Sequence, residues 1–187
     1  MGLDILVLVV YTTGHMKILY VALLSILIYL LAAGNILAST FSLSPGKTTI
    51  SSGSVVPVDF KINTNNESIN GVSAYLAYPL DRVEVEWITY SEAFPVQAEE
   101  SYGEGNIKIS RGSFLGETGD VTIATIGFRG KAIGEAVVSF IDGSFAPRTS
   151  DSSDSLNFAG STGATLTIQE SQVASTDFFC FLLECIL

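Results

Sequence analysis

The chain has 187 residues, with 19 Asp and Glu against nine Lys and Arg, a formal net charge of −10 and a single histidine. An acidic surface of this kind repels phosphate backbones and anionic lipid headgroups, so we expect no nucleic acid partner and no adsorption to anionic membranes. The length that remains between two apolar ends is that of one domain.

Residues 1–38 have the pattern of a targeting segment. Lys17 precedes an unbroken apolar run, Ile18 to Ala33, and the small residue Ala38 follows. These are the three parts of a secretory signal, with cleavage expected after Ala38 and with Met16 as a candidate for the true start. The run up to Ala38 is also long enough to span a bilayer as a helix, so an uncleaved anchor is the alternative. Membrane contact is expected only through this segment.

The domain that follows, residues 39–170, begins with two strands of alternating character. Every second residue from Val56 to Ile62 is apolar, and a polar turn follows at 63–68. The same alternation continues from Val72 to Tyr78, and this strand turns Ser73, Tyr75 and Ala77 to the opposite face.

The next two strands are predicted around Val83 to Trp87 and at Ile107 to Ile109, the latter after the glycine-rich turn 102–106. Trp87 is in phase with Val83 and Val85, which predicts that its indole lies in the core.

Two longer apolar runs, 121–128 and 136–141, are rich in β-branched residues and bounded by glycine, as is typical of central strands. A Ser/Asp loop at 149–155 and a last strand at 165–168 complete the domain. No segment of it has a helical period. The chain is therefore predicted to be all-β, a two-sheet sandwich of jelly-roll or immunoglobulin type.

Residues 171–187 are predicted to be a tail outside the fold. Its apolar end, 178–187, contains both cysteines, and it is too short to span a membrane. It is either the stump of a truncated anchor or frameshifted sequence. Residues 1–15 likewise suggest an overextended reading frame. Because the cysteines lie in the tail, the domain is expected to hold no disulfide.

The order of these strands resembles that of cohesin domains. The segment 69–85, INGVSAYLAYPLDRVEV, is similar to the family's alternating strand, Tyr-Asp-Pro-like turn and Leu-Glu-Val, except that no Asp stands between Tyr78 and Pro79. The resemblance continues through 105–110, 123–128, 138–144 and 163–168, and so covers nearly all of the domain.

This resemblance implies a jelly-roll sandwich of about nine strands that binds a dockerin module on one sheet face and performs no chemistry. It places the strand carrying Ser73 and Tyr75 in the partner-binding sheet, so these two residues are the first candidates for partner contact. Lys108 and Ser110 extend the same surface and Arg111 lies at its edge. Tyr75 as a simple cross-strand filler is the alternative.

Catalysis has little support in the sequence. The only histidine is His15, so the domain has no base for a Ser or Cys nucleophile. Glu84 and Glu86 share a strand face at a spacing that an inverting glycosidase could use, but a solvated face is the favoured interpretation. Asp151, Asp154 and Asn157 could hold calcium, and a polar loop is favoured there as well. We expect no enzyme activity, no cofactor and no metal.

Three functions remain open for an extracellular, secreted or surface-attached domain of this kind. The first is a scaffold or adhesion module that binds a protein. The second is a carbohydrate-binding module of the same fold, with Tyr75, Tyr90 and Tyr102 as the stacking residues for a polysaccharide. The third is a structural cell-surface domain. Exposure of the three tyrosines should discriminate among them.

Overall fold

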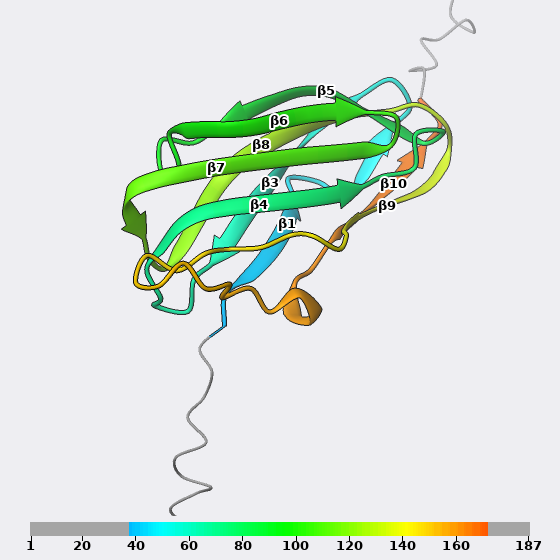
Figure 1. Cartoon of the computed structure of the whole chain (residues 1–187). Coiled ribbons are helices and arrows are strands. Elements are labelled where there is room, and N and C mark those ends of the chain that lie inside the picture. Colours follow the sequence, from blue (N-terminus) through cyan, green and yellow to red (C-terminus); the bar gives the residue numbers. More distant parts are fainter. Residues whose placement is uncertain (1–37, 172–187) are drawn as a thin grey trace, which may run out of the picture. The chain divides into compact units, whose positions relative to one another are not determined.

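The computed structural model describes residues 38–171, which form a two-sheet β-sandwich (Figure 1). The predicted signal or anchor helix and the apolar tail lie outside these residues. The described strands, in chain order, are β1 (Thr40–Pro45), β2 (Thr49–Ser51), β3 (Val55–Asn63), β4 (Ile69–Ala77), β5 (Val83–Tyr90), β6 (Val96–Gly103), β7 (Asn106–Glu117), β8 (Asp120–Gly130), β9 (Gly134–Phe140) and β10 (Ala164–Gln169). One 3-10 turn, Phe158–Gly160, precedes β10.

The first sheet has the order β1-β3-β8-β5, with all neighbours antiparallel. β3 and β8 are its central strands, and their β-branched residues fit a pleated surface that is packed on one side. Pro57 has no N–H group to donate to a neighbouring strand. It is tolerated in β3 because β1 ends beside it, at the pairing of Pro45 with Val58.

The second sheet has the order β2-β10-β9-β4-β7-β6, and β2 runs parallel to β10. β9 pairs with β4 only at Leu76 and Ala77. Beyond β9, the chain stays beside β4 through isolated bridges from Phe145 to Ser73 and from Arg148 to Ile69. This irregular segment lengthens the sheet on the side of β4 that faces away from β7.

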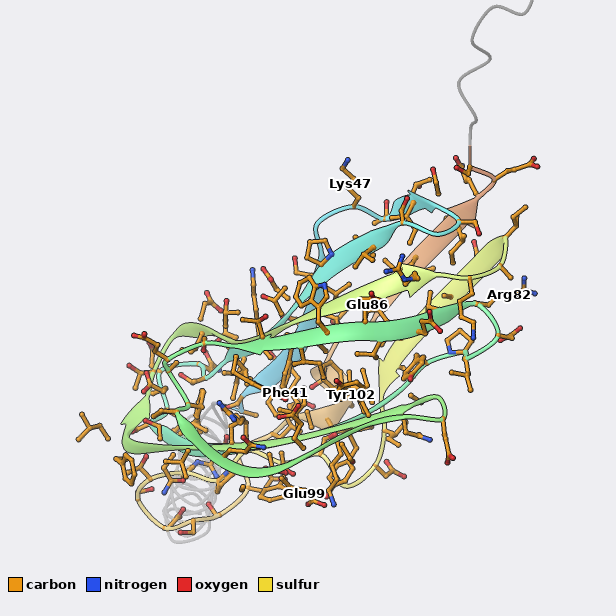
Figure 2. All side chains as sticks on the ribbon, turned by 90° about the horizontal axis from the view of Figure 1, so that it is seen from above. Phe41, Lys47, Arg82, Glu86, Glu99 and Tyr102 are labelled. Atoms are coloured by element: carbon orange, nitrogen blue, oxygen red, sulfur yellow. The ribbon has the colours of Figure 1, made fainter. Side chains whose placement is uncertain are left out.

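The core lies between the two sheets. Phe41 and Phe60 from the first sheet and Phe140 from the second form an aromatic cluster, with ring centroids 5.1–5.6 Å apart. Figure 2 shows Phe41 enclosed between the sheets. The cluster joins the two layers, because its rings come from both of them.

The predicted strands at 56–62, 72–78, 83–87, 107–109, 121–128, 136–141 and 165–168 are confirmed, and 121–128 and 136–141 are central as expected. The count of about nine is exceeded by one, and β1 and β2 were not among the individually predicted strands. β6 was missed, since VQAEESYG has no alternation and is exposed along most of its length.

Trp87 was wrongly predicted to be in the core. Val85 pairs with Phe128, but Trp87 pairs with Gly127, so one extra residue of β5 is accommodated between them. Such a bulge reverses the faces of the residues that follow it. Ile88 and Tyr90 consequently turn inward, and Trp87 is 39% exposed on the outer face.

Among residues 38–171, the structure contains no helix of the length and apolarity required to cross a membrane.

Candidate interaction surface

The outer face of β4 and β7 carries four of the five residues that the sequence predicted for partner contact. Tyr75 lies opposite Lys108, and Ser73 lies opposite Ser110. Their neighbours Ala74, Leu76, Ile107 and Ile109 are buried in the core. Since side chains alternate along a strand, Tyr75, Lys108 and Ser110 must project from the other face of the sheet.

Tyr75 and Lys108 form a contacting pair. The Lys108 ammonium lies 5.0 Å from the centroid of the Tyr75 ring and 2.6 Å from the carboxylate of Glu99 on β6. The hydrogen bond from Lys108 to Glu99 raises the pKa of this ammonium. Figure 2 shows Glu99 on the outer side of its sheet. Three adjacent strands thus present an aromatic ring, a cation and an anion in one oblique row, since Glu99 lies opposite Ser110 and reaches Lys108 diagonally.

The backbone around Tyr75 is fixed by the segment that follows β9. The Tyr75 amide donates to the Ser144 hydroxyl over 3.0 Å, and the Tyr75 carbonyl accepts from the Ile141 amide over 2.9 Å. Gly143 lies beside the ring, because a Cβ added there would sit 3.6 Å from two ring atoms. Tyr75 is therefore more than a partner in one cross-strand pair.

A shallow depression of about 510 Å³ opens beside this pair, at the end of the sheet where β6 turns into β7. Its lining includes Tyr75, Ser101, Tyr102, Lys108 and Ile141. Ile141 and Phe145, on the segment after β9, add exposed apolar area to the same sheet. The surface thus combines apolar and charged groups, as protein-binding surfaces do.

Ser73 does not fit the predicted contact role. It is only 3% exposed, and its hydroxyl lies 2.6 Å from that of Ser110. Its amide donates to the Phe145 carbonyl, and its carbonyl accepts from the Phe145 amide, each over 2.9 Å. Ser73 can therefore support the surface but cannot itself supply contact area.

Arg111 does not lie at the edge of the outer surface, where it was predicted. It follows Ile107 and Ile109 in phase, and its guanidinium lies 3.9 Å from the centroid of the Tyr90 ring on the other sheet. Its Nε donates to the Phe94 carbonyl over 3.2 Å. Arg111 thus covers the core between the two sheets at the edge of the sandwich, and it does not contribute to the outer surface.

The three tyrosines do not form one stacking platform. Tyr75 lies on the outer face, whereas Tyr90 lies between the sheets beneath Arg111. Tyr102 pairs with the buried Ile107 and is 48% exposed at the open edge. A row of coplanar exposed rings would be needed to bind a flat polysaccharide here, and Tyr90 cannot belong to one.

The buried hydroxyl of Tyr90 leads to a testable prediction about the stability of the domain. This hydroxyl is buried with no partner in hydrogen-bond geometry among residues 38–171, and this burial, together with the Glu100 carboxylate close beside it, raises its pKa. We expect Tyr90→Phe to increase the free energy of unfolding by about 1 kcal/mol, because it removes an unsatisfied group. Because the pKa of Tyr90 is higher in the folded than in the unfolded protein, the unfolded chain ionises first as the pH rises. The free energy of unfolding is therefore unaffected by this group below about pH 10 and falls as the pH rises further.

Urea titrations at neutral pH and above pH 10 would measure both effects, and Tyr102→Phe, on an exposed tyrosine, is the matched control. A Tyr90→Phe variant less stable than the parent protein would show that the hydroxyl has a partner after all.

The other candidate sites are occupied by internal contacts. Arg129 binds Glu86 through two hydrogen bonds of 2.8 and 2.6 Å and lies 4.0 Å from Glu84. The hydrogen bonds from Arg129 lower the pKa of Glu86. A carboxyl that acts as a general acid needs a raised pKa, so Glu86 is unsuited to that role. Both glutamates share the solvated outer face of β5, as the favoured interpretation predicts.

The Ser/Asp loop is likewise closed by its own hydrogen bonds. Asp151 accepts from Ser153, Asp154 accepts from the amides of Ala146 and Leu156, and Asn157 accepts from Gly160. The part of the chain that the structure describes contains no group of three or more His, Cys, Asp or Glu side chains arranged to hold a metal ion.

Sequence reasoning missed Glu99, Ser101, Ile141 and Phe145. Glu99 and Ser101 lie on the unrecognised strand β6, and Phe145 joins the surface through a pairing with Ser73 that no local pattern encodes. An acidic, polar stretch before a glycine-rich hairpin turn was the only available signal for β6.

No protein-family model matches the sequence, and no curated protein matches it. Solved structures do match the fold. A non-cellulosomal cohesin from the archaeon Archaeoglobus fulgidus has a TM-score of 0.59 at 17% identity, over 72% of this chain and 94% of that one. The sixth cohesin of scaffoldin B from Acetivibrio cellulolyticus, solved in complex with a Cel5 dockerin mutant, has a TM-score of 0.57 at 19% identity, over 70% and 99%.

A cohesin module from a Clostridium perfringens family 33 glycoside hydrolase has a TM-score of 0.59 at 12% identity, over 72% of this chain and 98% of that one. The domain therefore has the fold of cohesin modules, as its sequence resemblance predicts. At these identities the likeness is one of fold.

Proposed function

We propose that this domain is a non-catalytic docking module that binds a dockerin-like protein on the outer face of β9, β4, β7 and β6. The observation that carries the proposal is the fixed row of Tyr75, Lys108 and Glu99 across three adjacent strands. An anchored aromatic ring with charged neighbours is the kind of group from which interfaces draw most of their binding energy.

The fold supports the same proposal. Several of the matching cohesins were solved in complex with dockerins. In this chain, exposed apolar area from Ile141 and Phe145 lies on the sheet that carries Tyr75. The partner's complementary surface would offer an apolar patch for these residues, with a carboxylate near Lys108 and a basic group near Glu99.

The setting that we propose is extracellular, either secreted or attached to the cell surface. The apolar presequence with its single lysine supports export, and the high negative charge suits solubility outside the cell. A scaffold or adhesion role follows from such a setting, with a structural surface domain as the alternative if no partner is found.

The test is isothermal titration calorimetry of the full chain against a panel of purified dockerins. We expect saturable binding of at least one dockerin, with Tyr75→Ala weakening it. Trp87→Ala, an aromatic truncation on the opposite sheet, is the matched control and should leave it unchanged. Absence of binding across the panel, or equal weakening by both variants, would contradict the proposal.

A further inference from the structure

The outer face of the other sheet carries the only tryptophan of the chain. Trp87 on β5 pairs with Gly127 on β8, and Gly127 pairs with Pro57 on β3. A Cβ at residue 127 would lie within 2.7 Å of three atoms of the indole ring. Because the three distances are similar, the indole lies with its face, and not its edge, over this glycine.

The three residues form a flat apolar strip. Gly127 is buried beneath the indole and leaves room for it, Pro57 is an exposed compact ring, and the second face of the Trp87 indole is turned to solvent. The strip crosses three adjacent strands, a width of about 10 Å. It offers a plane rather than a pocket, so it suits a ligand with a flat apolar face better than a projecting protein side chain.

Polar groups border the strip on both sides. On one side, Arg129 is held by Glu86; on the other, the Thr125 hydroxyl donates to Asp59 over 2.9 Å. Each group lies one pleat repeat from the strip, roughly 7 Å along its strand. Because these groups are fixed by one another, they present hydrogen-bonding atoms at set positions beside the plane.

The charged groups nearest the strip cancel one another. Three carboxylates, Asp59, Glu84 and Glu86, are paired with three cations, Lys61, Arg129 and Lys131, at distances of 2.6–4.0 Å. Residues 38–171 as a whole carry 16 acidic against eight basic side chains. A locally neutral face on an acidic domain is complementary to an uncharged ligand, and it favours neither a nucleic acid nor a basic protein.

From these observations we infer a second binding site, in which Trp87, seated on Gly127, and Pro57 form the platform for an extended chain of neutral pyranose sugars. The apolar C–H face of a sugar ring stacks on the indole, and its equatorial hydroxyls reach the bordering groups on either side. The site lies on the sheet opposite Tyr75, so the inference does not depend on the proposed docking function.

Trp87 is also the reporter for the test, because it is the only tryptophan. The full chain, in a detergent without a sugar headgroup, would be titrated with cellohexaose and with maltohexaose while its intrinsic fluorescence is recorded. We expect a saturable change with cellohexaose, whose β-linked chain is extended and flat. Maltohexaose, whose α-linked chain is curved, should bind at least tenfold more weakly.

Variants make the result specific. Gly127→Ala keeps the tryptophan but lifts its ring from the sheet, and it should weaken cellohexaose binding at least tenfold. Trp87→Ala, followed by calorimetry, should do the same, whereas Tyr75→Ala should have no effect. The inference would be overturned by no saturable change up to about 1 mM cellohexaose, or by unchanged affinity in Gly127→Ala and Trp87→Ala. Because the Tyr75 surface is separate, failure here would leave the docking proposal standing.

Discussion

Replacing Phe60 with alanine is expected to lower the free energy of unfolding by about 3–5 kcal/mol. Phe60 is completely buried, and its ring lies 5.1 Å from Phe41 in the same sheet and 5.6 Å from Phe140 in the other. Its removal leaves a cavity where the two layers meet, and the surrounding strands cannot close over it without losing their pairing. Because a domain of this size has a total stability of about 5–15 kcal/mol, the loss would be a large share of it.

Urea denaturation of the full chain would measure this effect. Phe60→Leu, which keeps most of the volume, should cost less than about 1.5 kcal/mol. Phe114→Ala removes the same ring from a site that is 84% exposed and should change stability by less than about 0.5 kcal/mol. Equal effects at positions 60 and 114 would show that the aromatic cluster does not hold the sheets together.

The second large effect is expected at the docking surface. Tyr75→Ala should weaken dockerin binding by about 30-fold or more, the loss expected when a hot-spot residue is truncated. Lys108→Glu should weaken it to a similar extent, because it removes the cation beside the ring and places a negative charge next to Glu99. Both side chains are at the surface, so neither change should unfold the domain.

The two positions should also be coupled. Tyr75 and Lys108 touch, so the double variant should lose less affinity than the two single losses combined. Calorimetry on the four proteins of this cycle measures the coupling. Strict additivity would mean that the two residues act on the partner independently and that the row is not one binding unit.

Much of the architecture could be predicted because it follows from alternation. β3, β4, β8 and β9 bury every second residue or a continuous apolar run, and their order resembles that of cohesin domains. β6 could not be predicted in this way, because an edge strand covered on neither face has no apolar period to detect. Its glutamates instead protect an exposed sheet edge.

The candidate site was predicted only in part, for two physical reasons. The bulge at Glu86 reverses the facing of Trp87, and a one-residue insertion leaves no mark in the alternation that precedes it. Arg111 was predicted at the edge of the outer surface, whereas its stem stays in the inward phase of β7 and its guanidinium reaches the Tyr90 ring. Tyr75, Lys108 and Ser110 were placed on one face because no bulge interrupts the pairing between 71 and 77 on β4.

The most direct test of the docking proposal is photo-cross-linking from each outer face. A photoreactive amino acid would replace Ser101 on β6 in one variant and Thr89 on β5 in another; both residues are exposed on edge strands, one on each sheet. With a dockerin that binds the full chain, we predict cross-links from position 101 and none from position 89. Cross-links from position 89 alone, or equally from both, would contradict the assignment of the docking surface to β9, β4, β7 and β6.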